Sequence, residues 1–460
     1  MKKTLISLVV GIGLASNAIA DDLLQVYQQA IENDPIVNRA KANRDAAYEG
    51  ITISRANLLP QISADIGYSI STRDNTNAIT DPDTEQFLGF AVFENESESL
   101  SMGADLRMSL YDHANWLGLD RAELVAQQSE ASYSAELQRL ISRTVQAYLA
   151  VLTEKDNVEF VKAEKRAIAR QLEQTQQRFE VGLTAITDVH EAQADFDNTV
   201  ARQIRAQNQL DLRLEELREI TGKYHDELYV LNTDSFSANK PFPEAVTDWL
   251  DIAQESNLDL QTQRFAKDIA KEDINIASSG HYPSLGLSAS YGRTDTTIVN
   301  GNQNGGDLDV PTLNNQSIGV SLSVPIYQGG AVSARATQAR YQFVAASETL
   351  ELTYRQTVRL VRSSFNNVNA TISAIRALEQ SVVSAQSALE ATDAGFEVGT
   401  RTIVDVLNST RNLFDARRNL SSARYDFIQS IIELKAAAGN LTRTDVEAIN
   451  KGLMPNPVEN

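Results

Sequence analysis

The residue types that most often carry catalysis are scarce and scattered in this chain of 460 residues. Cysteine is absent, and no histidine pairs with a second ligand at the spacing of a metal site. The four histidines are His113, His190, His225 and His281. The sequence also contains no phosphate-binding glycine-rich loop and no serine nucleophile elbow. We therefore expect no enzyme activity, no catalytic residue, no bound metal and no cofactor.

Polar residues with a more suggestive arrangement follow a repeated tetrapeptide. Phe-Glu-Val-Gly at 179–182 returns at 396–399. Thr187 and Asp188 come just after the first copy, and Arg401 comes just after the second.

Helix capping is the interpretation that the residues after the second copy favour. Thr402 and Asp405 have the spacing of a capping box, and acidic side chains are favoured in the first turn of a helix. From the residues alone, we therefore interpret this region as a helix cap.

The tetrapeptide belongs to an internal duplication of most of the chain. Residues 179–222 align without a gap on 396–439, and at another constant offset Ile51 and Tyr68 fall on Ile274 and Tyr291. Each half is therefore one structural unit. The predicted divisions are a signal peptide (1–20), a first repeat (21–222), a linker (223–247), a second repeat (248–439) and a C-terminal tail (440–460).

The first 20 residues have the features of a secretory signal peptide. Lys2 and Lys3 precede an apolar run over 5–15, and Ala18-Ile19-Ala20 forms a small-residue cleavage site. A membrane anchor is the alternative, but a spanning helix needs about 20 apolar residues and this run has about half of that. We expect export and cleavage after Ala20.

The net charge of the chain is −20 at pH 7, which argues against nucleic acid as a partner. Such an excess of acidic residues suits a water-filled lumen and suits simple solubility equally well.

Four stretches alternate apolar and small polar residues, which predicts two pairs of β-strands. The stretches are 62–70, 100–110, 284–291 and 317–326. Their length and alternation are typical of strands that cross an outer membrane, although a half-buried soluble sheet alternates in the same way. Export favours the membrane, and so do the long polar loops expected over 72–99 and 292–316. Four strands cannot close a barrel, so we expect two, three or four chains to assemble.

Helical sequence makes up most of the rest of each repeat. Residues 22–59 keep helical spacing, and two proline-free stretches over about 113–178 and 332–394 predict helices on the order of 100 Å long. Each long helix would reverse at Gly182 or Gly399 and return, over 186–220 in the first repeat and over 403–438 in the second. We expect residues 223–247 to form an irregular segment that crosses the helices. We expect residues 441–460 to form a short tail that packs nearby and frays at Pro455 and Pro457.

This order of elements, run twice behind a signal peptide, resembles the TolC family of outer-membrane efflux channels. The resemblance covers most of the chain, from about 21 to 440. Three stretches are similar to sequence motifs of the family. They are LSVPIYQGG at 322–330, VRSSFNN at 361–367 and VGTRTIVDVL at 398–407. The runner-up is a periplasmic coiled-coil adaptor or tether.

The resemblance implies a membrane α/β barrel built by a homotrimer. Four strands per chain would form a 12-stranded β-barrel in the outer membrane, continuous with a 12-helix α-barrel in the periplasm. The implied function is a passive exit duct for drugs, toxins or proteins, in efflux and in type I secretion. The implied partners are outer-membrane lipid, a periplasmic adaptor (membrane fusion) protein and an inner-membrane pump of RND, ABC or MFS type.

The resemblance also implies roles for residues at the two turns. Arg401 would donate charge-assisted hydrogen bonds to Thr187 and Asp188, as a latch that holds an iris-like periplasmic gate closed. Asp405 would form a charged ring at the constriction, where mutual repulsion favours uptake of protons or cations. Residues of the two turns would receive the adaptor: Val181, Gly182, Leu183, Val398, Gly399 and Thr400.

Two departures from the family's pattern concern this gate. Well-known members have a tyrosine where this chain has Phe396, so one latch bond is missing. They also have a second aspartate ring where this chain has Asn408. We therefore expect a latch with fewer bonds and weaker cation capture at the entrance.

Overall fold

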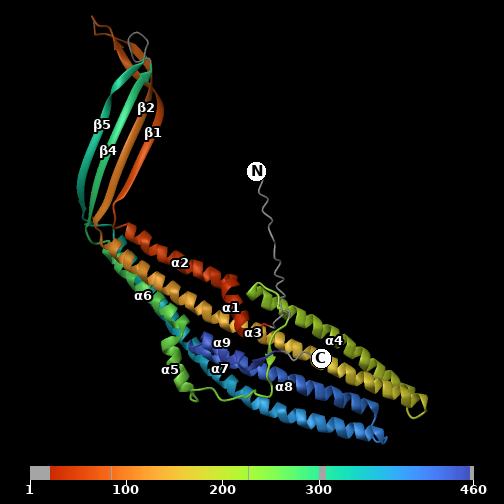
Figure 1. Cartoon of the computed structure of the whole chain (residues 1–460). Coiled ribbons are helices and arrows are strands. Elements are labelled where there is room, and N and C mark those ends of the chain that lie inside the picture. Colours follow the sequence, from red (N-terminus) through yellow and green to blue (C-terminus); the bar gives the residue numbers. More distant parts are fainter. Residues whose placement is uncertain (1–20, 84, 226, 300–306, 456–460) are drawn as a thin grey trace, which may run out of the picture. The chain divides into compact units, whose positions relative to one another are not determined.

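The computed structural model describes residues 21–83, 85–225, 227–299 and 307–455. Two helices, two strands and two long helices follow one another twice along the chain (Figure 1). The first set is α1 (Leu23–Asn33), α2 (Pro35–Ala56), β1 (Gln61–Thr80), β2 (Phe87–Tyr111), α3 (His113–Glu180) and α4 (Ile186–Thr221). The second set is α5 (Val246–Ser256), α6 (Leu258–Ser279), β4 (Ser284–Val299), β5 (Leu308–Ser323), α7 (Ala331–Glu397) and α8 (Ile403–Ala438). β3 (Val230–Leu231) separates the sets, and α9 (Arg443–Asn450) and β6 (Leu453–Met454) end the described chain.

The chain divides into two compact units, and each unit draws on both sets of elements. One, the strand unit, comprises residues 44–129 and 263–349. The other, the helix unit, comprises the described residues of 21–43, 130–262 and 350–455. The repeat boundaries expected from the sequence stay a prediction, and the signal peptide and residues 456–460 lie outside the described residues.

The strand unit contains one antiparallel sheet with the order β1-β2-β4-β5 (Figure 1). Its register places apolar residues of neighbouring strands opposite one another, as in the pairs Ile62 with Leu106 and Ile66 with Met102. The predicted alternation and pairing of strands are confirmed. Within the described part of the chain, the outer edges of β1 and β5 carry no further strand.

The loops expected between the paired strands are too long, and this prediction was wrong. β1 continues to Thr80 and β2 begins at Phe87, so the ladder includes polar pairs such as Thr72 with Glu96. β4 and β5 likewise extend over much of 292–316, whereas β5 ends at Ser323, before the predicted 326. The backbone ladder does not need apolar side chains where both faces can meet water, so a change in composition does not mark where a strand ends.

The two very long helices are confirmed, since α3 has 68 residues and α7 has 67. The return helices begin at Ile186 and Ile403, as the sequence predicts. The expected single helix over 22–59 is instead broken at Asp34, because Pro35 disfavours a helical conformation in the residue before it. None of the described helices has both the length and the apolar character to cross a membrane.

A break at the equivalent position of each repeat joins two helices, and the two breaks use different chemistry. Asn257 corresponds to Asp34, and both are buried. The Asn257 amide accepts a hydrogen bond from Leu260 N at 3.0 Å and donates one to the Ala437 carbonyl at 3.0 Å. It therefore caps the start of α6 and the end of α8 at once. Asp34 accepts from Val37 N at 2.8 Å, but a carboxylate has no proton to donate to a second helix end.

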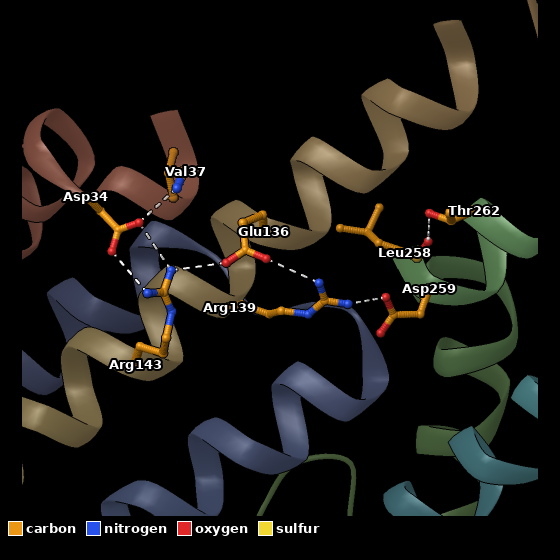
Figure 2. Close-up of polar contacts among 8 residues, drawn as sticks. All are labelled: Asp34, Val37, Glu136, Arg139, Arg143, Leu258, Asp259 and Thr262. Carbon is orange, nitrogen blue, oxygen red and sulfur yellow. Dashed lines mark hydrogen bonds and ion pairs between the residues drawn. The ribbon is translucent and has the colours of Figure 1, made fainter. Parts of the chain in front are cut away.

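Asp34 instead begins a row of charges that runs along α3 to the start of α6 (Figure 2). Arg143 donates to Asp34 at 3.0 Å and to Glu136 at 3.0 Å. Arg139 donates to the other oxygen of Glu136 at 3.2 Å and to Asp259. One face of α3 thus contacts the helix breaks of both repeats.

The helix unit is held by two large apolar cores and a short ladder. One core centres on Tyr148 and Leu217, and the other on Trp249 and Leu434. The tail packs as expected, because β6 pairs with β3 of the linker.

The helix joints predict different responses at two equivalent glycines. Gly222 and Gly439 both have positive φ, 71° and 77°, so alanine at either costs about 1–2 kcal/mol. A Cβ at Gly439 would also lie 2.5 Å from Ser256 O and from Asn257 Cα, whereas at Gly222 the nearest atom would be 3.5 Å away. Gly439→Ala should therefore destabilise the protein by about 1–3 kcal/mol more than Gly222→Ala. The midpoint temperature of helix loss, followed by circular dichroism in detergent, measures this, and equal shifts in the two variants would contradict it.

Candidate functional site at the helix turns

Both long hairpins reverse through the same backbone path. Gly182 and Gly399 have φ of 79° and 78°, in the left-handed region that glycine adopts without strain. The glycine N–H donates to the carbonyl of the preceding phenylalanine, at 2.9 Å in the first turn and 3.1 Å in the second. The N–H of the next residue donates to the carbonyl five residues back, at 2.8 Å in both. The glycine reversals predicted from the sequence are confirmed.

The turns present apolar side chains to solvent. Val181, Leu183 and Val398 are 70%, 69% and 75% exposed, and the adjoining Gly182, Gly399 and Thr400 are exposed too. Apolar groups gathered on an exposed tip mark a surface that can bind a partner. These are the residues predicted to receive an adaptor, and that role stays a prediction.

In the second turn the carboxylate of Asp405 is occupied by capping. Thr402 begins α8 as its N-cap, and its N–H and hydroxyl each donate to Asp405 at 3.0 Å. Asp405 N donates back to the Thr402 hydroxyl at 3.3 Å. The backbone N–H of Thr402, its hydroxyl and the positive charge of Arg401 together hold the pKa of Asp405 below its ordinary value. Within one chain the cap therefore favours the charged form, opposite to the effect expected of repulsion between three copies.

The equivalent aspartate of the first turn is arranged differently. Ala185 is the N-cap of α4 and has no side chain that could cap it. Asp188 accepts a hydrogen bond from the Thr184 hydroxyl instead. Asp188 therefore takes no part in a capping box and can accept further bonds from a cation.

The structure does not bring the three predicted latch residues together within one chain. Arg401 lies beside Gly395, where its Cγ would be 2.8 Å from an added Cβ. In the described ranges, no hydrogen bond or ion pair joins Arg401 to Thr187 or Asp188. The latch stays a prediction.

The predicted inner ring position carries an amide next to a cation. Asn408 lies on α8 and accepts a hydrogen bond from Arg411 at 3.4 Å. Arg411 also forms an ion pair with the largely buried Asp195 of α4 at 2.5 Å. A positive group therefore lies beside Asn408, which weakens the local attraction for cations beyond the loss of one carboxylate.

Sequence reasoning missed a ladder of buried and half-buried carboxylates that joins α8 to the first hairpin. Three α8 residues at seven-residue spacing each contact one carboxylate. The pairs are Arg411 with Asp195, Arg418 with Glu164 at 3.1 Å, and Tyr425 with Asp156 at 2.9 Å. Burial raises the pKa of Asp156 despite its bonds to Ser421 and Tyr425. The seven-residue spacing of polar residues on α8 is the signal that could have revealed this ladder.

The capping box predicts a local response to substitution and to acid. Thr402→Ala should speed hydrogen exchange of the amides at 403–407 by about fivefold, because the helix start loses its cap. The first turn of α4, which has no side-chain cap, is the internal reference.

Acid should act on the same turn. The pKa of Asp405 is lower in the folded protein than its ordinary value of 3.8. The charged carboxylate therefore stabilises the helix start fully at a pH above 3.8, and this stabilisation is lost only as the pH falls through the lower pKa of the folded state. Native protection at 403–407 should therefore persist down to pH 3.8, and its loss well above that pH would contradict the cap.

Comparison with known proteins gives one consistent result over nearly the whole chain. The model of the family described as outer membrane efflux protein matches residues 26–223 and 249–440. Outer membrane protein TolC of Vibrio cholerae is 46% identical over 443 residues, which are 96% of each chain. TolC of Escherichia coli is 42% identical over 98% of this chain and 89% of that protein. The alkaline protease secretion protein AprF of Pseudomonas aeruginosa is 29% identical over 95% of this chain and 88% of its own.

Solved structures share the fold at low sequence identity. The Campylobacter jejuni CmeC outer membrane channel has a TM-score of 0.73 at 18% identity, over 94% of this chain and 89% of its own. The open state of the Neisseria gonorrhoeae MtrE outer membrane channel has a TM-score of 0.71 at 18% identity, over 92% and 91%.

Proposed function

The chain belongs to the outer membrane efflux protein family, and from that premise we propose that its two helix turns form the gate of a trimeric exit duct. The observation that carries this proposal is the contrast between the two aspartates of the turns. Asp405 is engaged by the cap of its own helix, whereas Asp188 lies outside any capping box and beside an uncapped helix start.

As a member of this family the chain is an outer-membrane channel and not an enzyme. Three copies assemble, so their four-stranded sheets make a barrel of 12 strands and their helices a barrel that extends into the periplasm. The duct passively passes drugs, toxins or proteins from an inner-membrane pump and a periplasmic adaptor to the exterior, in efflux and type I secretion. A periplasmic tether is not supported, because the relatives that match nearly the full chain are outer membrane proteins.

The gate closes through a latch between neighbouring subunits. Arg401 lies beside its own Asp405, and its own Asp188 is bonded to Thr184. Threefold assembly brings the Thr187 and Asp188 of a second chain to the same tip, where a guanidinium can bond both groups. Each exposed pair stabilises the closed state by about 1 kcal/mol or less, so three together hold the gate and still release it.

The entrance itself combines one acidic ring with an apolar rim. Three copies of Asp405 form the ring, and Asn408 with the nearby Arg411 makes the inner position uncharged or positive. The exposed Val181, Leu183 and Val398 surround the turns and form the surface on which the adaptor docks.

The latch predicts that Arg401→Ala opens the channel. Loss of three guanidinium contacts should shift the gate toward the open state and raise single-channel conductance severalfold in a planar lipid bilayer. A variant that conducts like the native channel would remove the latch while leaving the channel intact.

Cysteine crosslinking tests which chains the latch joins. The native chain has no cysteine, so Asp188→Cys with Arg401→Cys introduces a single oxidisable pair. Oxidation should link separate subunits and give covalent oligomers on a denaturing gel. Asp156→Cys with Ser421→Cys is the matched control, because those side chains meet within one chain at 2.5 Å and should leave monomers. Monomers from the first pair would place the latch within one subunit.

The inner position predicts the response to polyvalent cations. Asn408→Asp adds three carboxylates to the entrance and should lower the cation concentration that blocks half the current on the order of tenfold. Asp405→Asn should have the opposite effect. An unchanged blocking concentration in both variants would show that cations are captured elsewhere in the duct.

A further inference from the structure

Phe396 is buried although it lies in the last turn of α7, next to an exposed loop. It is 6% exposed, whereas Phe179, the equivalent residue of the first turn, is 40% exposed. The backbone of the two turns is the same, so the difference comes from what surrounds each ring.

Both hairpins supply the surroundings of Phe396: Ile403, Val406 and Leu407 of α8 belong to its own hairpin, and the other buried members come from the first. The ring shares one apolar cluster with Ile168 and Leu172 of α3 and Ala192 of α4. The guanidinium carbon of Arg178, in the last turn of α3, lies 4.6 Å from the ring centroid. A cation over an aromatic face at this distance is attracted by the negative face of the ring. Phe396 is therefore covered by apolar groups and by a cation of the opposite hairpin.

The duplication makes this contact one-sided. Arg178 corresponds to Gly395 in the second repeat, and a Cβ at Gly395 would lie 2.8 Å from Arg401 Cγ. A reciprocal arginine at 395 would displace Arg401, and Phe179 remains exposed. Only the first turn can therefore supply the cation and only the second the buried ring.

We infer that Arg178 and Phe396 form an aromatic lock that holds the second hairpin against the first within each subunit and keeps the gate closed. The inference rests on the proposed gate and adds two residues to it. Movement of the second turn away from the first must expose the ring and separate it from Arg178.

Four variants of the full-length trimer test the lock by single-channel recording. Arg178→Gln removes the cation, Phe396→Leu removes the aromatic face but keeps an apolar side chain, and the double variant removes both. Each single variant should raise the ratio of open to closed states by about two- to fivefold per subunit. The double variant should do no more than the stronger single one, because both remove the same contact. Arg178→Lys keeps a cation and should restore most of the closure.

Arg218→Gln is the matched control. Arg218 lies 3.9 Å from the Tyr224 ring and also pairs with Glu215, so this substitution removes one charge, one cation contact and one ion pair, far from the turns in the sequence. It should leave gating unchanged, and all variants should resist dissociation by heat like the native trimer.

The outcomes separate the lock from the proposed gate. A pore that opens with Arg401→Ala but behaves natively with Arg178→Gln and Phe396→Leu would overturn the lock and leave the gate standing. Additive effects in the double variant, or the same opening with Arg218→Gln, would also overturn the lock. Absence of conductance from the native protein would overturn the proposed function itself.

Discussion

The unpaired edges of the four-stranded sheet are the constraint on which the rest of the molecule depends. Within the described part of one chain, β1 and β5 each bond a neighbour on one side only. In lipid no water can satisfy the exposed backbone groups of such an edge, so other chains must supply the missing strands. Three subunits meet that need. The helices inherit the same symmetry, so every residue at a turn is present three times around one axis and weak contacts act together.

The helix unit resists sliding of one helix along another through charges placed in its interior. Glu164 is fully buried between Arg202 and Arg418, and Asp195 pairs with Arg411. Such pairs add little stability, but they select one register of the helices. A shift by one helical turn would leave a buried carboxylate without its partner. The ladder on α8 therefore fixes the register between the second hairpin and the first, and the turns at its end are positioned with it.

The sequence predicted the elements whose signals are local. Alternation of apolar residues gave the strands, and the glycines of the repeated tetrapeptide gave both reversals. It did not predict where β1 ends, because the ladder past Ser71 continues through polar pairs such as Thr72 with Glu96, where the alternation of apolar residues stops. The roles of the turn residues were even harder to predict from the sequence. Identical tetrapeptides give one buried and one exposed phenylalanine. The difference comes from an apolar cluster and from Arg178, which no spacing in the sequence connects with Phe396.

The helix breaks at Asp34 and Asn257 show that equivalent residues of the two repeats have acquired different roles. An aspartate in the place of Asn257 could not donate to the Ala437 carbonyl, and an asparagine in the place of Asp34 would remove one of the two carboxylates that Arg143 contacts. A chain made of two copies of either half would therefore carry a mismatched joint. A ring of six identical half-length chains would be the simplest ancestor of the trimer. Because the two joints now need different residues, neither half of this chain could form such a ring without a mismatch at every second joint.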